Sequence, residues 1–314
     1  AQGAHLIVVN HALLLSDLAK NGSILPEHRC LIIDEAHRLE EEATDQLGYD
    51  VSEHDIQDFL SQFGEKGGFG FRLRAYLRGV PATSSRRGAT ERLKELQEKA
   101  KVCREHASEQ VDTLGSFLQA SRQWGRSDYE SNLRITGAVR GQPKWSEVEL
   151  AWENLSLGFT GIENDLAELH AVMDDLPDKR NVELSGVLAE MSSLRQQART
   201  LRSQLDAMLS NPESRTIYWA TLNSQYGLSL HAAPLQVGEM LEKNLFSQKD
   251  AVVLTSATLS IGGSFQYMKN TLGLGEADEL AIDSPFDYKK STMIYLPHDI
   301  PEPETPGYQQ GVAL

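Results

Sequence analysis

The 314-residue chain has few cysteines and no long apolar run, and each scarcity excludes a class of protein. Its two cysteines, Cys30 and Cys103, stand far apart in no CxxC pattern, which argues against a disulfide scaffold and a zinc site. No stretch approaches the roughly 18 apolar residues of a membrane span, and the N-terminus lacks the basic and apolar regions of a signal peptide. We therefore expect no membrane association and a cytoplasmic location.

Acidic side chains outnumber basic ones by 45 to 30, which gives a formal net charge of -15. This balance argues against a surface that attracts nucleic acid or anionic membranes everywhere, although a local basic face is compatible with it. The hydrophobic fraction of 40% is enough for a sizeable core. The length predicts about two domains.

Short aliphatic runs near both ends of the chain predict strands. Residues 6–9 and Cys30–Ile33 are aliphatic on both faces, as buried parallel strands are. Similar runs follow Pro212, at residues 216–219, 228–231, 251–255, 280–282 and 293–296. The sequence thus predicts one α/β domain that a long helical insertion divides, followed by a proline-rich linker at residues 297–306.

The middle of the chain carries apolar residues at alternating spacings of four and three. Such seams become buried only against partner helices, so we expect three long helices in an antiparallel bundle, with Trp145 and Trp152 in its core. Turns are expected at residues 137–143 and 177–178, and Gln110 is the exception in the first seam. The seams are Leu93, Leu96, Ala100, Cys103, Ala107, Leu114 and Phe117; Val148, Trp152, Leu155, Phe159, Ile162, Leu166, Leu169, Met173 and Leu176; and Leu184, Val187, Met191, Leu194, Ala198, Leu201, Leu205 and Met208.

The tetrapeptide Asp34-Glu35-Ala36-His37 directly follows the run Cys30–Ile33. It therefore falls at the carboxyl edge of the expected parallel sheet, where ligands of open α/β sheets bind. Two adjacent carboxylates at that edge suit a nucleoside triphosphatase, in which one holds Mg²⁺ and the other polarises the attacking water. The alternative is a helix start with Asp34 as its N-cap.

A second polar segment, Thr255-Ser256-Ala257-Thr258-Leu259, also ends an aliphatic run. Its hydroxyl groups could bond both the acidic motif and a neighbouring loop, or simply cap a helix. His11 follows the run at residues 6–9, and we interpret it as a hydrogen-bonded packing residue near the same edge.

Residues 31–40, LIIDEAHRLE, and 253–259, VLTSATL, resemble motifs II and III of superfamily 2 helicases. The helical insertion between them narrows the resemblance to the DinG/XPD group, and the SATL sequence to its bacterial DinG branch. The resemblance implies a partial RecA-like P-loop motor domain with an inserted helical arch domain. It implies that Asp34 holds Mg²⁺ with ATP, that Glu35 is the catalytic base, and that His37, Ser256 and Thr258 couple hydrolysis to strand movement. It also implies 5′-to-3′ movement on single-stranded DNA and partners among replication or repair proteins.

Three family features are missing from the sequence. It contains no GxxxxGK[ST] loop and no QxxGRxxR pattern, and Cys30 and Cys103 do not match the iron–sulfur ligands, which would lie upstream of Ala1. We therefore expect a fragment without ATPase activity of its own. Its expected parts are a first motor segment at 1–50, the arch at 51–213, a second motor segment at 214–287, and a linker or second motor domain at 288–314. The rival interpretation is a non-enzymatic helical scaffold or DNA-binding module on a degenerate motor domain.

Basic residues gather between Lys66 and Arg104, where 11 Lys or Arg accompany three Glu. Some of them alternate with aromatic and apolar residues, as in proteins that contact phosphates beside stacking platforms. The alternative is a solvated helix face on which Glu91, Glu95 and Glu98 pair with Lys94 and Lys99. The predicted DNA-binding residues are Arg72, Arg74, Arg78, Arg86 and Arg87.

Overall fold

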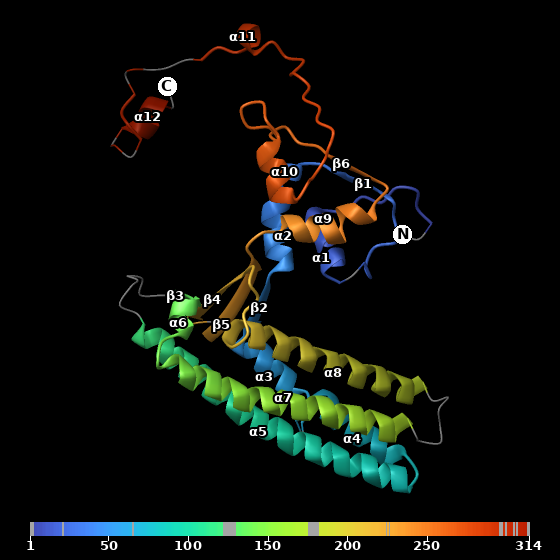
Figure 1. Cartoon of the computed structure of the whole chain (residues 1–314). Coiled ribbons are helices and arrows are strands. Elements are labelled where there is room, and N and C mark those ends of the chain that lie inside the picture. The colour runs from blue at the N-terminus through green and yellow to red at the C-terminus, as the bar shows by residue number, and fades with distance from the viewer. Residues whose placement is uncertain are drawn as a thin grey trace. The chain divides into compact units, whose positions relative to one another are not determined.

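The computed structural model describes residues 3–20, 22–64, 66–121, 130–174, 182–223, 225, 227–294, 298, 300–303, 305 and 307–312 (Figure 1). The chain divides into two units, Ala1–Gly275 and Glu276–Leu314. Both helices and sheets are present, so the mixed α/β class that the sequence predicts is confirmed. Among the described residues, no helix is long and apolar enough to cross a membrane.

Two strands distant in sequence form a parallel pair. β1 (Cys30–Ile33) pairs with β6 (Ala251–Leu254), with Cys30 opposite Ala251 and Ile33 opposite Leu254. Ile33 is buried, whereas Ile32 is 72% and Val253 52% exposed. The pair is therefore covered on one face only, and the prediction of strands buried on both faces is wrong for the described residues.

Four helices contribute to the core beneath this pair, and they lie close to it in Figure 1. Buried leucines from each helix meet there, among them Leu15, Leu39, Leu241 and Leu272. Two short 3₁₀ turns, Ala36–Arg38 and Phe246–Gln248, lie in the same part of the chain. The helices are α1 (His11–Ala19), α2 (Leu39–Leu47), α9 (Gly238–Asn244) and α10 (Gln266–Leu272).

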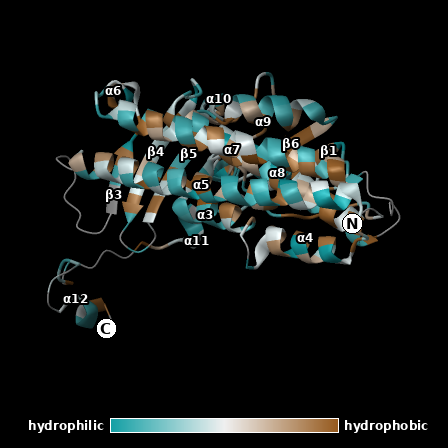
Figure 2. Cartoon of the chain, turned by 90° about the horizontal axis from the view of Figure 1, so that it is seen from below, coloured by the Kyte–Doolittle hydropathy of each residue, from teal (hydrophilic) through white to brown (hydrophobic). Residues whose placement is uncertain are grey.

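The three predicted long helices are present as α5 (Ser84–Ala120), α7 (Trp145–Asp174) and α8 (Val182–Leu209). α7 packs against both others. Its contacts with α5 run in opposite order along the two helices, from Lys99–Asp165 to Phe117–Trp145, and so do those with α8, from Arg199–Glu163 to Asp206–Trp152, so neighbouring helices are antiparallel. Hydrophobic and hydrophilic residues alternate along these helices in Figure 2, as their seams predict. Every described seam residue is buried or packs partly buried against the core, including Trp145 and Trp152, while Leu176 and the turn at 177–178 lie outside the described residues.

Shorter helices accompany the bundle: α3 (Glu53–Ser61), α4 (Gly68–Gly79) and α6 (Gly137–Arg140). α3 begins with a capping box, in which Ser52 and Asp55 bond each other's backbone N–H groups. α3 and α4 both contact α5. Residues 68–79, with the arginines among them, are therefore helical.

A four-stranded antiparallel sheet joins the bundle, in the order β2-β5-β4-β3. Buried residues of β4 and β5, including Tyr218 and Leu230, belong to the same core as the long helices. The predicted strands at 216–219 and 228–231 therefore exist, but they pair within this sheet and not with the parallel pair. The strands are β2 (Tyr49–Ser52), β3 (Glu130–Arg134), β4 (Thr216–Asn223) and β5 (Gly227–Pro234).

Two predicted strands do not form. Among the described residues, 6–9 have no strand partner, and Leu6 is 79% and Val8 87% exposed. In the unit Glu276–Leu314, residues 280–282 are unpaired, with Ile282 83% exposed. Residues 293–294 are not in a strand, and 295–296 lie outside the described residues, as does part of the expected linker. An aliphatic run becomes a strand only beside a neighbour that bonds its backbone. This unit contains the short helices α11 (Tyr288–Ser291) and α12 (Tyr308–Val312).

Candidate functional site

Backbone hydrogen bonds join the two polar motifs where β1 and β6 end. The Thr255 N–H donates to the Ile33 carbonyl at 2.9 Å, and the Ala36 N–H donates to the Thr255 carbonyl at 3.0 Å. Between them, Glu35 has a φ of 50°, and it is the non-glycine residue with a positive φ among those described. A left-handed conformation is uncommon for such a residue, and it turns the chain sharply from strand into the 3₁₀ turn. The loops predicted to meet at one sheet edge therefore do so.

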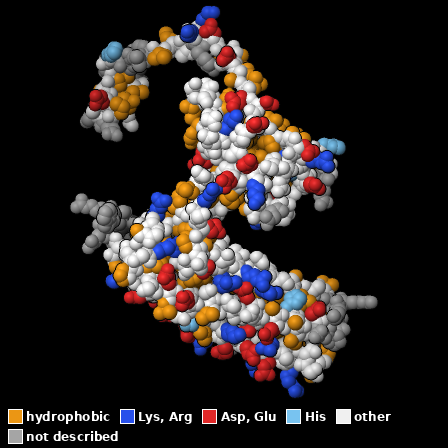
Figure 3. Space-filling model, viewed as in Figure 1, with side chains coloured by type: hydrophobic (Ala, Val, Ile, Leu, Met, Phe, Trp, Pro, Cys, Tyr) orange, Lys and Arg blue, Asp and Glu red, His pale blue; other side chains and the backbone are white. Residues whose placement is uncertain are grey.

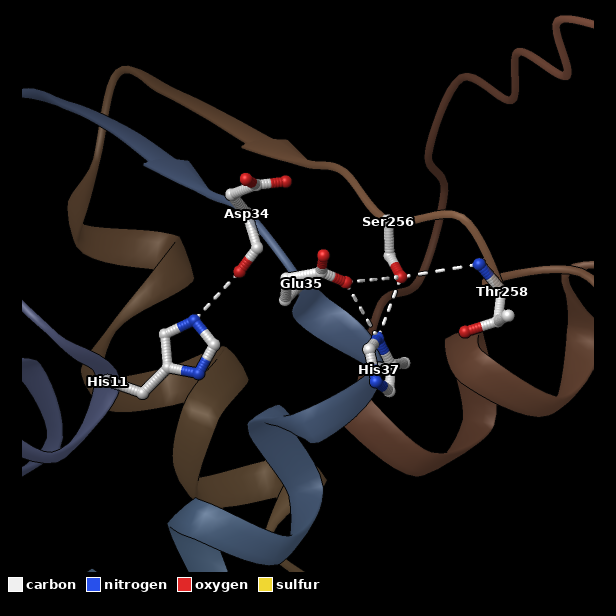
Figure 4. Close-up of polar contacts among 6 residues, drawn as sticks. All are labelled: His11, Asp34, Glu35, His37, Ser256 and Thr258. Atoms are coloured by element: carbon white, nitrogen blue, oxygen red, sulfur yellow. Dashed lines mark hydrogen bonds and ion pairs between the residues drawn. The ribbon is translucent and has the colours of Figure 1, made fainter. Parts of the chain in front are cut away.

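The side chains of Glu35, His37 and Ser256 form a bonded cluster (Figure 4). His37 Nδ1 lies 2.7 Å from Ser256 Oγ and 3.3 Å from Glu35 Oε2. Ser256 Oγ donates to Glu35 Oε2 at 3.4 Å, and the Thr258 N–H donates to Ser256 Oγ at 3.3 Å. A serine hydroxyl has one proton to give. The Ser256 hydroxyl gives that proton to Glu35 and also lies against Nδ1 of His37, so it bridges the two side chains.

Solvent reaches this cluster, since the Glu35 side chain is 59% and the His37 side chain 39% exposed. One carboxylate oxygen of Glu35 is engaged by the serine and the histidine, and the other is drawn free of them in Figure 4. This geometry leaves Glu35 able to accept a proton from water while two neighbours hold its orientation. The alternative of Asp34 as a helix cap is not observed, because the 3₁₀ turn has no side-chain cap.

His11 anchors the first residue of the acidic motif. Its Nε2 donates to the Asp34 backbone carbonyl at 2.8 Å, from the first residue of α1. Asn10 caps the same helix by accepting a hydrogen bond from the Leu13 N–H, which fixes the start of α1 at His11. The sequence predicts a hydrogen-bonded packing residue near this edge, and the structure confirms the hydrogen bond; its partner, a carbonyl 23 residues away, has no signal in the sequence.

The Asp34 carboxylate points away from the cluster and is exposed, with no partner among the described residues (Figure 4). Mg²⁺ in nucleotide sites is commonly held by one or two carboxylates, with phosphates and water completing its shell. Asp34 fits that donor set. Within the described residues, no three acidic, His or Cys side chains gather to hold a metal unaided. The chain's contribution to such a site is therefore Asp34 with Glu35 beside it, not a complete cage.

The five predicted DNA-binding arginines lie on α4 and the first turn of α5, in different surroundings. Arg72 forms an ion pair with Glu190, Arg74 donates to the Gln97 side chain, and Arg86 donates to the Val80 carbonyl at 2.8 Å. Arg78 and Arg87 are exposed and have no acidic partner among the described residues. Figure 3 shows basic and acidic side chains interspersed over the helical region.

The alternative, in which Glu91, Glu95 and Glu98 pair with Lys94 and Lys99, is not found among the described residues. Lys99 instead pairs with Asp165 of α7 at 2.6 Å, and Arg92 pairs with Glu95 and with Glu168. Lys94 and Lys101 have no ion-pair partner in the described part of the chain and are exposed. Two lysines near the predicted arginines therefore carry charge that no carboxylate among the described residues neutralises.

Comparison with known proteins finds relatives along nearly the whole chain. It is 25% identical over 320 residues to the 3′-5′ exonuclease DinG of Bacillus subtilis, covering 96% of this chain and 32% of that protein. It is 24% identical to the ATP-dependent DNA helicase YoaA of Escherichia coli, covering 100% of this chain and 42% of that protein. It is 27% identical to the ATP-dependent helicase DinG of Mycobacterium tuberculosis, covering 97% of this chain and 38% of that protein. No family model matches. The chain thus spans about a third to two-fifths of these relatives' lengths.

Proposed function

Because this chain is a DinG-like helicase sequence, we propose that it is part of an ATP-dependent DNA helicase. In this proposal the parallel pair belongs to a RecA-like motor domain, and the bundle with its antiparallel sheet is the arch. The strand pairing favours an arch that includes residues 216–234, in place of a boundary at 213. The remaining strands of the motor domain, the phosphate loop and any iron–sulfur ligands would lie in other segments of the intact protein.

The observation that carries the proposal is the bonded cluster of Glu35, His37 and Ser256. Glu35 accepts the proton of the attacking water, and Asp34 would hold a Mg²⁺ ion, which would supply positive charge against the ATP phosphates. His37 and Ser256 orient Glu35, and the Thr258 N–H fixes the serine. Since these residues come from segments on either side of the arch, a shift of one segment alters how Glu35 is held. This provides a route from hydrolysis to strand movement. A degenerate motor domain would have no need to keep this cluster.

The proposed substrate is single-stranded DNA, which the intact protein follows in the 5′-to-3′ direction during repair or replication. The cytoplasmic location and the replication or repair partners belong to the same proposal. The isolated chain, which has no GxxxxGK[ST] sequence, should not hydrolyse ATP. The DNA-binding role of the five arginines is also a proposal, and their different neighbours make their contributions unequal.

The test is Glu35→Gln in the intact protein. Removing a positioned base costs about 10²–10⁴-fold in rate, so ATP turnover should fall by that factor while nucleotide binding is retained. Glu41→Gln is the matched control, because Glu41 is an exposed carboxylate of the neighbouring helix α2. Undiminished turnover in Glu35→Gln, with Glu41→Gln unchanged, would contradict the role given to Glu35.

A further inference from the structure

An open groove of about 880 Å³ lies along α5, between α4 and the residues that follow α3. Its described lining contains six cationic side chains and one carboxylate, Glu98. Apolar side chains such as Leu77 and Leu93 form part of its wall. In a chain with a net charge of -15, this is a local concentration of positive charge. The six cations are Arg74, Arg78, Arg86, Lys94, Lys101 and Arg104.

Several cations beside the groove are neutralised by carboxylates, whereas five of those that line it have no acidic partner among the described residues: Arg78, Arg86, Lys94, Lys101 and Arg104. On the surrounding surface, Arg72 pairs with Glu190, Arg92 with Glu168, and Lys99 with Asp165. In the groove, Arg86 and Arg104 donate to the carbonyls of Val80 and Leu60, at 2.8 and 3.1 Å. A neutral carbonyl fixes a guanidinium without cancelling its charge. The groove therefore holds pre-positioned positive charge.

The residues of α5 that line the groove form a long row. Its lining residues on α5 recur at positions 86, 90, 94, 97, 101 and 104, which is one face of the helix. At a rise of 1.5 Å per residue, that face extends over about 27 Å. A compact anion such as a free nucleotide would reach only part of this row. An extended polyanion can engage it from end to end.

Its aromatic content also bears on the ligand. Phe63 lines the groove but is only 1% exposed, so no base can stack on it. Without an exposed stacking platform among the described lining residues, recognition rests on phosphates, which carry no sequence information.

We propose that this groove binds the phosphate backbone of single-stranded DNA, with Lys94, Lys101 and Arg104 as contacts in addition to Arg74, Arg78 and Arg86. The identification of the polyanion as DNA rests on the proposed helicase function. The strand lies along α5, and the ion-paired Arg72 lies off its path.

The test is the binding of a fluorescent 15-residue oligothymidylate to the full chain without ATP, followed by anisotropy over a series of salt concentrations. If four phosphates are engaged, the slope of log K against log salt is about -2.8, by the single-strand value of about -0.7 per phosphate. Lys94→Gln/Lys101→Gln should reduce the slope to about -1.4. If the variant and the parent chain bind equally at 1 M salt, this difference in slope makes the Kd of the variant about 25-fold higher at 0.1 M salt.

The matched control is Lys20→Gln/Lys144→Gln, which removes two exposed lysines outside the groove lining. It should leave Kd within about twofold, because the Debye length at 0.1 M is about 10 Å. A second groove variant, Arg78→Gln/Lys94→Gln, guards against misfolding of the first, and circular dichroism checks that each variant is folded.

Three results would overturn the proposal: no binding by the parent chain at 50 mM salt, equal Kd values for groove and control variants, or complete competition by dTTP at equal phosphate concentration. The last would indicate a nucleotide site. None of these experiments measures ATP turnover, so their results can contradict the DNA-binding groove without contradicting the role of Glu35.

Discussion

The close packing of α5 against α7 at Gly158 can be tested. A Cβ atom at Gly158 would lie 2.8 Å from the sulfur of Cys103 and 3.1 Å from its Cβ atom. Cys103 is fully buried, so its sulfur has no solvent to move into, and the two helices would have to separate. Gly158→Ala therefore gains about 1 kcal/mol of helix propensity but incurs an overpacking cost of about 1–3 kcal/mol. The expected net result is destabilisation by up to about 2 kcal/mol.

Gly186→Ala on α8 is the matched control, because nothing lies within 4 Å of a Cβ atom built there. It should stabilise the chain by up to about 1 kcal/mol. Since both variants gain the same kind of propensity, the difference in their free energies of unfolding isolates the packing cost. Urea unfolding followed by circular dichroism at 222 nm measures it.

A double variant locates that packing cost. Cys103→Ala removes the sulfur, so Gly158→Ala should cost less in that background, with a coupling energy of about 0.5–3 kcal/mol. A Gly158→Ala chain as stable as Gly186→Ala, or an absent coupling, would refute the close approach of the two helices at this point.

Two further predictions concern the extent of the helical region and its thiol. A fragment of residues 48–235 should melt cooperatively and at a higher temperature than one of residues 50–213, because β4 and β5 complete the core; equal melting temperatures in circular dichroism would contradict this. Burial raises the pKa of the Cys103 thiol to about 12, whereas Cys30 is exposed, so one thiol should react rapidly with a disulfide reagent at pH 8 and the other only on unfolding. Cys30→Ser should abolish the rapid phase, and two rapid thiols in the folded chain would refute it.

The helices could be predicted because their burial repeats locally. Positions such as Val148, Phe159 and Leu166 recur at helical spacing, and all are buried. Even Gln110, the exception in its seam, is 3% exposed. The meeting of the acidic and SATL motifs was also predictable, because both end aliphatic runs and parallel strands share their carboxyl edge.

Strand partners and ion pairs could not be predicted in the same way. The runs at 216–219 and 228–231 look like those at 30–33 and 251–255, and apolar content alone does not say which strands will pair. Likewise, Lys99 has glutamates at helical spacing on α5 but bonds Asp165 of α7. The sequence does not show a partner on another element, so it also does not show that Lys94 and Lys101 lack an ion-pair partner among the described residues.

The antiparallel sheet connects the helical region to the candidate site. β2 leaves α2 and pairs directly with β5, which returns from the bundle, so that Tyr49 faces Ala232 and Ser52 faces Ser229. The outgoing segment continues from His37 through α2, and the returning segment leads through α9 to β6 and Ser256. Close packing at Gly48, where an added Cβ atom would lie 2.8 Å from the Ala232 carbonyl oxygen, leaves little room for one segment to slide past the other. Both segments therefore reach the His37–Ser256 contact from one hydrogen-bonded pair of strands. If the bundle binds a DNA strand, any force on it is transmitted first to this pair, and from there to the two residues that orient Glu35.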